Sequence, residues 1–217
     1  MAVIHKTTMD PGKLDLIGAW LPTRPWYTAA GGPPELTVSG GFRLDDPRGA
    51  VGMEFMVVTD TSGVRPVAYH VPLTYRGAPL DGAPDTALLG TSQHGVLGRR
   101  WVYDGAHDPV LVAQVLAFLQ GRTAAQDQNA SDTPDPSVTA HFSGAAVAVE
   151  AAAPRVTDGE HGTEIAVGAA PVRLTIVRAL HADGAEPRGR GHVSATWRPP
   201  TGDPARAAFL VLQDTPA

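Results

Sequence analysis

The sequence predicts an α+β fold in which a curved antiparallel β-sheet is flanked by two or more helices. Short apolar runs separated by Gly and Pro dominate the region 36–103, which is typical of strands. One long apolar segment, 108–120, lies between helix start and stop signals. The last third of the chain is again rich in short apolar runs. A length of 217 residues suits one domain or slightly more.

The first predicted helix covers residues 9–21. Asp10 is a suitable N-cap, and Pro11 suits the first helical turn because its missing N–H would have no partner there. Pro22 is expected to end the helix. Apolar side chains recur on one helical face at Leu14, Ile17 and Leu21.

The second predicted helix covers residues 108–120 and has clearer boundaries. Asp108 is the expected N-cap, Pro109 the first helical residue, and Gly121 the left-handed residue after the last turn. The helix is apolar nearly all round, so we expect it to be buried against the sheet.

Strands are predicted between the two helices. Gly40 and Gly41 mark a tight turn or a bulge, and 60–63 is expected to be a hairpin loop. A polar stretch, 92–94, separates the last two runs. The predicted strands are 36–38, 42–44, 51–59, 67–75, 88–90 and 100–103.

The second part of the chain is predicted to be nearly all β. Residues 122–137 contain no large apolar side chain, so we expect a flexible linker or loop between a region 1–121 and a region 138–217 that extends the same domain. Loops are expected at 154–162 and 181–190. The predicted strands are 139–150, 171–179, 191–197 and 207–212.

Composition and charge exclude several classes of function. The net charge of −5 disfavours nucleic-acid and polybasic membrane binding, because phosphate groups attract clustered positive charge. There is no cysteine, which excludes disulfides, thiolate zinc sites and cysteine nucleophiles. No apolar run approaches the ~20 residues that span a bilayer, and the first residues lack the apolar stretch of a signal peptide. We therefore expect a cytoplasmic protein without membrane contact.

The motifs of common enzymes are missing. The sequence has no G-x-x-x-x-G-K-[ST] phosphate loop, no G-x-G-x-x-G after a strand, no G-x-S-x-G and no H-E-x-x-H. It also lacks a kinase catalytic loop. We therefore predict no catalytic residue, no cofactor and no metal site, and expect a protein that is not an enzyme.

Three polar clusters have weaker alternative interpretations. Ser92 and His94 place a nucleophile and a base in one strand connection, although catalysis there would also need an acid and an oxyanion hole. The residues around 158–161 carry two acids and a histidine, which we interpret as a solvated loop. Asp45-Asp46-Pro47 is interpreted as a turn, because Asp side chains bond their own backbone there.

The most informative candidates combine tryptophan with arginine. Flat aromatic faces with hydrogen-bonding arms suit sugar rings, but the same side chains also build ordinary cores, which we favour. Trp20, Trp26 and Trp101 are accordingly expected to be mostly buried. The candidate ligand-binding residues are Trp20, Arg24, Trp26, Arg99, Arg100, Trp101 and Asp104.

Three runs resemble the N-terminal cap domain of actinobacterial maltokinases. The run 16–27, LIGAWLPTRPWY, resembles the opening W-L-x-x-[QR]-R-W-[FY], with Pro25 in place of the second basic residue. The run 71–76, VPLTYR, resembles a V-P-L-x-Y-R strand, and 97–105, LGRRWVYDG, resembles the closing segment. The resemblance covers roughly residues 1–120 and occurs in the same order.

The resemblance implies a cap without its kinase. In maltokinases the cap precedes a body that phosphorylates maltose with ATP, whereas residues 122–217 carry none of its catalytic motifs. We therefore expect a non-catalytic accessory or regulatory protein of α-glucan, trehalose or maltose metabolism, with a kinase or glucan-metabolising enzyme as partner. The alternatives are a module that binds maltodextrin or an amino sugar, and a small enzyme of unknown reaction.

Overall fold

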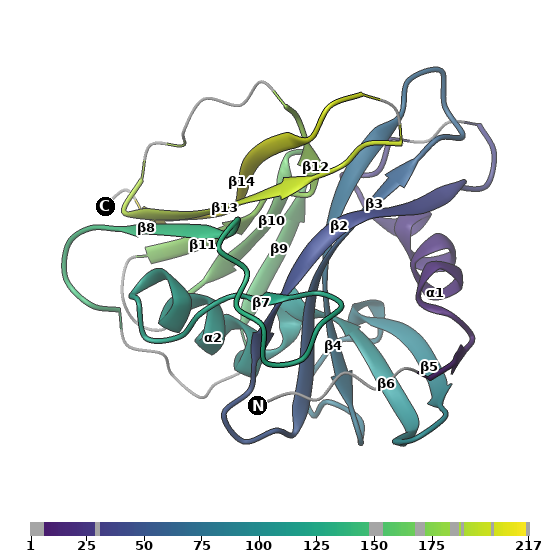
Figure 1. Ribbon diagram of the computed structural model, residues 1–217, viewed down its shortest axis with the longest axis horizontal. Coiled ribbons are helices and arrows are strands. Elements are labelled where there is room, and N and C mark those ends of the chain that lie inside the picture. The colour runs from purple at the N-terminus through teal and green to yellow at the C-terminus, as the bar shows by residue number, and fades with distance from the viewer. Residues whose placement is uncertain are drawn as a thin grey trace.

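The computed structural model describes residues 7–28, 31–147, 154–167, 172–182, 187, 189–200 and 202–215. Over these ranges the chain forms one antiparallel sheet of 14 strands with two α-helices, which fits the α+β class (Figure 1). The strand order is β1-β5-β6-β4-β3-β2-β13-β14-β11-β10-β9, while β12 pairs with β4, β7 with β2 and β8 with β13. The curvature of the sheet stays a prediction.

In the first half of the chain β2, β3 and β4 pair in sequence order, and the β5–β6 hairpin and β1 extend this antiparallel sheet through β6, which pairs with β4; we call this part of the sheet the meander. Gly40 and Gly41 do not end a strand: the register with β3 shifts between Val38 and Gly40, so these glycines form a bulge within one long strand. The polar stretch 92–94 likewise belongs to a strand. The strands are β1 (Met9–Asp10), β2 (Leu36–Asp45), β3 (Val51–Asp60), β4 (Val67–Arg76), β5 (Leu88–His94) and β6 (Gly98–Asp104).

The second half continues the same sheet, because β13 pairs with β2 through Trp197 and Gly40. The prediction of a loop at 154–162 is wrong: β9 and β10 form a hairpin there. Its two strands are short and carry a Gly at the turn, which left little apolar alternation to detect. The strands are β8 (Thr139–Phe142), β9 (Arg155–Gly159), β10 (Gly162–Ala166), β11 (Val172–Ile176), β12 (Ala179–Leu180), β13 (Gly191–Trp197) and β14 (Ala205–Asp214).

The segment expected to be a linker, 122–137, packs against the sheet. It contains β7 (Gln126–Asp127), which pairs with residues 42–43 of β2, and it buries Ala125. The division of the chain at 121 and 138 stays a prediction. The predicted strand 139–150 ends at Phe142, and the predicted strand 171–179 is interrupted after Ile176; residues 148–150 and 171 lie outside the described residues.

Helix α1 (Lys13–Trp20) begins later than predicted. Asp10 is not its N-cap, because Asp10 lies in β1 and pairs with Gln93 of β5. Gly12 occupies the cap position instead, and its N–H donates to the Asp15 carboxylate at 2.9 Å. The 3₁₀ helix η1 (Leu21–Thr23) continues α1 and contains Pro22. Together they cover one face of the meander, where Ile17 and Leu21 are fully buried.

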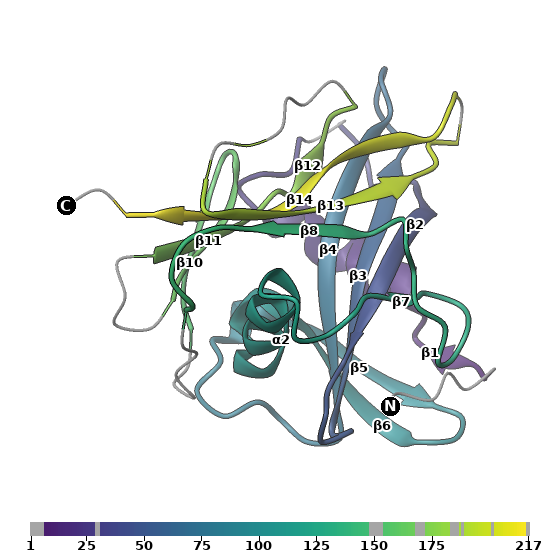
Figure 2. The ribbon, with the colours of Figure 1, turned by 60° about the vertical axis from the view of Figure 1, so that its left-hand side comes forward.

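Helix α2 (Pro109–Leu119) has the predicted boundaries. Asp108 caps it through a bond from the Val110 N–H at 2.9 Å, and Gly121 has a positive φ of 68°. Figure 2 shows α2 below β8, β13 and β14 and beside β2–β4. It therefore packs against both halves of the sheet, on the face opposite α1, and its burial joins them in one hydrophobic cluster. Two further 3₁₀ helices are η2 (Asp85–Ala87) and η3 (Gly105–His107).

Among the described residues, no helix has both the length and the hydropathy needed to span a bilayer.

Candidate functional site

The face of the meander that carries α1 holds two groups of buried polar side chains, one near each end of the helix. The Glu54 cluster, at the start of α1, consists of Lys13, Glu54, Tyr75 and Gln128. The Arg178 network, beyond the end of α1, consists of Arg24, Asp104, Asp158, Thr163 and Arg178.

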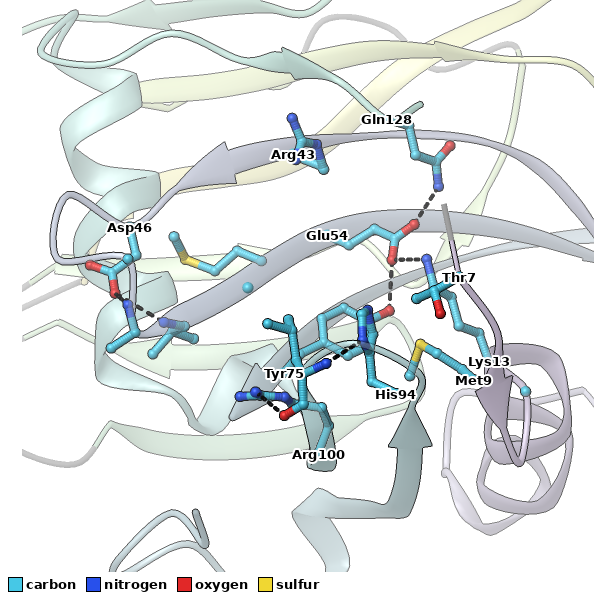
Figure 3. A pocket seen from close by; sticks show the side chains of 17 residues that line it. Thr7, Met9, Lys13, Arg43, Asp46, Glu54, Tyr75, His94, Arg100 and Gln128 are labelled. Atoms are coloured by element: carbon cyan, nitrogen blue, oxygen red, sulfur yellow. Dashed lines mark hydrogen bonds and ion pairs between the residues drawn. The ribbon is translucent and has the colours of Figure 1, made fainter. Parts of the chain in front are cut away.

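Glu54 is a carboxylate buried in the middle of the sheet. Its side chain faces α1 because Met53 and Phe55, its neighbours on β3, point into the α2 core. Oε2 accepts from Lys13 Nζ and from the Tyr75 hydroxyl, both at 2.6 Å, and Oε1 accepts from Gln128 Nε2 at 2.7 Å. Figure 3 shows Glu54 between these three partners.

Glu54 is ionised at neutral pH. Burial alone would raise the pKa of Glu54, but the Lys13 ammonium and the three hydrogen bonds outweigh it and lower this pKa below its ordinary value. Burial, together with the Glu54 charge, raises the pKa of Tyr75 well above its ordinary value. Glu54 is thus held as an anion and Tyr75 as a neutral hydrogen-bond donor.

A cavity of about 690 Å³ opens beside the Glu54 cluster (Figure 3). A second cavity of about 810 Å³ adjoins it and shares Gly12, Lys13, Glu54 and Gln128. The first is lined by the start of α1, by β2–β4 and by the β5–β6 hairpin. Its polar and charged lining side chains are Thr7, Lys13, Arg43, Asp46, Glu54, Tyr75, His94, Arg100 and Gln128.

The Arg178 network is centred on a fully buried arginine. Arg178 Nη2 donates to Asp104 Oδ2 at 2.5 Å, and Nε donates to Thr163 Oγ1 at 2.7 Å. Its guanidinium lies 4.9 Å from the Trp26 ring, a cation–π contact. Burial and the charge of Arg178 lower the pKa of the adjacent His70 to about 3, so His70 is neutral.

The network continues to the surface through Asp158. Thr163 donates to Asp158 at 2.5 Å, and Arg24 pairs with Asp158 at 3.5 Å while lying over the Trp20 ring. Asp158 belongs to the predicted acidic loop, but it lies in β9 and is tied into this network.

The structure separates the predicted ligand-binding residues into two places. Trp20, Arg24, Trp26 and Asp104 meet at the Arg178 network, where both tryptophans and Asp104 are buried. Their contacts are structural ones, including a bond from the Trp20 indole to Thr86 O at 3.0 Å.

The remaining three candidates lie on opposite faces of β6. Arg100 shares the α1 face with Val102 and lines the first cavity. Arg99 and Trp101 lie on the other face, stacked at 5.1 Å, with Arg99 exposed and Trp101 half-buried. Successive side chains on a strand alternate in direction, so Arg100 cannot contact the same ligand face as Arg99 and Trp101. Whether any of the seven residues binds a ligand stays a prediction.

The other polar candidates have local partners. Ser92 donates to Pro11 O at 2.8 Å, while His94 Nδ1 accepts from the N–H groups of Val96 and Leu97. Asp46 accepts three backbone N–H bonds from residues 48, 50 and 51, which confirms the predicted turn. Within the described parts of the chain, no group of three or more His, Asp or Glu side chains is arranged to hold a metal ion.

Sequence reasoning missed Glu54, Lys13, Gln128 and Arg178. One signal was present for Glu54, which is the single charged residue in the apolar run 51–59. A charged side chain in a strand buried on both faces requires partners. The partners themselves come from distant segments, and no local pattern identifies them.

Fold and site together define an antiparallel-sheet protein with a polar cavity floored by a buried ionised cluster. Residues 20–108 match the family model of the maltokinase N-terminal cap domain. This confirms the resemblance over a segment that spans η1, β2–β6 and η3 and is shorter than half of the chain. No curated protein matches the chain.

The matched segment supplies only part of each polar cluster. Glu54, Tyr75 and Asp104 lie inside it, whereas Lys13, Gln128, Arg178 and the β9–β10 hairpin lie outside it. The cap-like meander is therefore completed by side chains from the rest of this chain.

Proposed function

We propose that the chain is an accessory or regulatory protein of α-glucan and maltose metabolism that acts by contact with a kinase or a glucan-metabolising enzyme. The match of residues 20–108 to a domain that caps a kinase carries the proposal. A non-catalytic role and a cytoplasmic location are parts of it.

The packing of the second half against the cap-like meander supports a protein in which this segment folds without a kinase body. In this chain Arg178 and Gln128 contact Asp104 and Glu54 of the cap-like meander. Arg178 pairs with the buried Asp104 carboxylate, and the uncharged Gln128 amide donates a hydrogen bond to the buried Glu54 carboxylate. The proposal therefore requires no second chain to complete the fold.

A reconstituted assay tests the proposal. The purified chain is added to a maltokinase and, separately, to glucan-forming enzymes from the same organism, and their rates are measured against chain concentration. We expect a saturable change of about fivefold or more in the rate of one of them, as for a coupling free energy near the lower end of the usual range. Serum albumin at equal concentration is the control.

Two results would overturn the proposal. Phosphorylation of maltose by the chain alone with Mg-ATP would make it a kinase in its own right. Unchanged rates of every enzyme at saturating chain would remove the regulatory role.

A second candidate is a module that binds maltodextrin or an amino sugar. It is favoured by the Arg99–Trp101 stack, where a half-buried indole lies beside an exposed guanidinium. A change in tryptophan fluorescence on titration with maltotetraose, abolished by Trp101→Phe, would support this candidate. A flat titration would contradict it.

A further inference from the structure

The cavity beside the Glu54 cluster has the size and lining of a small-molecule site. Its volume of about 690 Å³ falls within the ~300–1,000 Å³ usual for ligand pockets. It combines the apolar side chains of Met9, Val51 and Leu97 with converging polar groups. The chemistry of those groups indicates what it would bind.

The floor of the cavity offers an acceptor next to a donor. Each carboxylate oxygen has two acceptor positions, and Glu54 Oε2 fills both with Lys13 and Tyr75. Among the described residues, Oε1 accepts from Gln128 alone, and Lys13 donates to Glu54 alone. One acceptor position on Glu54 Oε1 and two N–H groups of the Lys13 ammonium are left. This combination suits a hydroxyl group, which both donates and accepts.

The side chains that line the cavity carry more positive than negative charges. Glu54 and Asp46 are the lining carboxylates, and both accept three hydrogen bonds from the protein. Lys13, Arg43 and Arg100 supply three positive charges. Arg43 donates to the backbone carbonyls of Asp127 and Ala130, so none of these bonds neutralises it.

Arg100 makes one hydrogen bond through its guanidinium. It donates to the carbonyl of Leu97, and its Nε is buried without a hydrogen-bond partner. In the part of the chain that the structure describes, Arg100 has no carboxylate partner. In Figure 3 it lies on the opposite side of Glu54 from Arg43.

We propose that this cavity binds a small polyhydroxylated organic anion, with a hydroxyl group between Glu54 and Lys13 and a carboxylate or phosphate at Arg100. The guanidinium fork of Arg100 suits either anionic group. The proposal is independent of the proposed function, since it concerns this chain alone.

Five probes distinguish recognition of the hydroxyl groups from recognition of the anionic group. Gluconate and glucose 6-phosphate carry both hydroxyls and an anion, glucose carries hydroxyls alone, and acetate and inorganic phosphate carry an anion alone. Thermal unfolding of the full chain is followed against each probe. A probe at 100 times its dissociation constant adds about 2.7 kcal/mol and raises the midpoint. We expect gluconate or glucose 6-phosphate to raise it most, and the better of the two identifies the anionic group.

Arg100→Gln is the diagnostic variant, and Arg155→Gln is its matched control. Both remove one positive charge from a strand, but Arg155 is an exposed residue of β9 outside the lining of the cavity. We expect Arg100→Gln to weaken the best probe about tenfold or more, as for loss of a hydrogen bond to a charged group. Arg155→Gln should change the affinity less than about threefold, because salt screens the attraction between a distant exposed charge and the ligand.

An amide chemical-shift map on the unsubstituted protein covers the case in which Arg100→Gln does not fold. Shifts on adding the best probe should concentrate at the start of α1, on β3–β4 and on the β5–β6 hairpin, and α2 should be unaffected. The proposal is overturned by equal affinity of the two arginine variants, by equal binding of glucose and its phosphate or acid, by a shift map centred elsewhere, or by no binding of any probe. Enzyme regulation in the reconstituted assay is unaffected by those results, so the two failures are distinguishable.

Discussion

Two buried charges determine how this face of the sheet is built. Glu54 is 4% exposed and Arg178 is fully buried, and each bonds to side chains from segments far apart in the sequence, although Arg178 Nη1 is buried without a hydrogen-bond partner among the described residues. Removing a charge of this kind leaves its partners without compensation, which costs more than the contact itself contributes. Hydrophobic neighbours set the position of these residues, and polar partners keep Glu54 ionised by lowering its pKa.

Glu54→Gln should destabilise the protein in a pH-dependent way. Since the pKa of Glu54 is lowered in the folded state, the carboxylate stabilises the fold above the ordinary glutamate pKa of about 4.3, and this contribution disappears as pH falls through the lower folded value. We expect a cost of about 1–3 kcal/mol at pH 7 that shrinks at pH 3. Urea unfolding at both pH values measures it.

The matched control for this measurement is Glu164→Gln. Glu164 pairs with Arg173 at 3.1 Å, but its side chain is 46% exposed, so the change should stay below about 0.5 kcal/mol. A cost for Glu54→Gln that is equal at pH 7 and pH 3 would contradict an ionised Glu54.

At the scale of elements, the bulge in β2 links the cap-like meander to the rest of the molecule. Gly40 faces Trp197 of β13, and Gly41 faces Gln128, the residue that reaches Glu54. Gly41 has a φ of 142°, and a Cβ there would lie 2.5 Å from the Phe55 carbonyl of β3. The bulge therefore brings a second strand pairing and the Glu54 partner to the same point.

Gly41→Ala should cost at least about 2 kcal/mol, because it adds both backbone strain and a collision with β3. Gly49→Ala is the control: Gly49 also has a positive φ, 68°, but beyond its chain neighbours no atom lies within 4 Å of where a Cβ would be, so only the strain of about 1 kcal/mol applies. Thermal unfolding compares the two. Equal costs would show that the contact with β3 does not matter.

Elements with strong local signals could be predicted, and elements defined by distant pairing could not. Helix α2 has its cap, its Pro and its final Gly in sequence, and β13 alternates from Gly191 to Trp197, so both have the predicted bounds. Asp10 looked like a helix cap because its pairing with β5 is invisible locally. The β9–β10 hairpin and β7 are short and polar, and their strand character comes from neighbours.

Local sequence signals likewise predicted only part of the candidate site. The tryptophan and arginine residues were recognised as important, and four of the seven do meet, but at a structural network. Alternation along β6 was sufficient to separate Arg100 from Arg99 and Trp101. The contacts of Glu54 with Lys13 and Gln128 span 41 and 74 residues, which only the fold reveals.

At the scale of the whole molecule, the two halves share one core and one network. Phe42 and Phe55 of the meander lie in the same hydrophobic cluster as Phe209 and Leu212 of β14, with α2 between. Arg178 joins them again through Asp104 and Trp26. A division near residue 121 or 138 would cut through both, so the free energy of unfolding should belong to the molecule as a unit.

Hydrogen exchange against urea should therefore show one global unfolding free energy for amides in β3–β4 and in β13–β14. Arg178→Met should lower both unfolding free energies by the same amount, about 3–5 kcal/mol. The substitution leaves the buried Asp104 carboxylate, in the other half of the molecule, without its ion-pair partner. Arg173→Met removes a partly exposed pair within the second half, with side chains 34% and 46% exposed, and should lower neither unfolding free energy by more than about 1 kcal/mol. Two results would show that the halves are separate folding units: amides in β13–β14 that exchange through an opening of lower free energy than those in β3–β4, or an Arg178→Met variant that destabilises one half alone. The cap-like meander would then be stable without the strands that complete it.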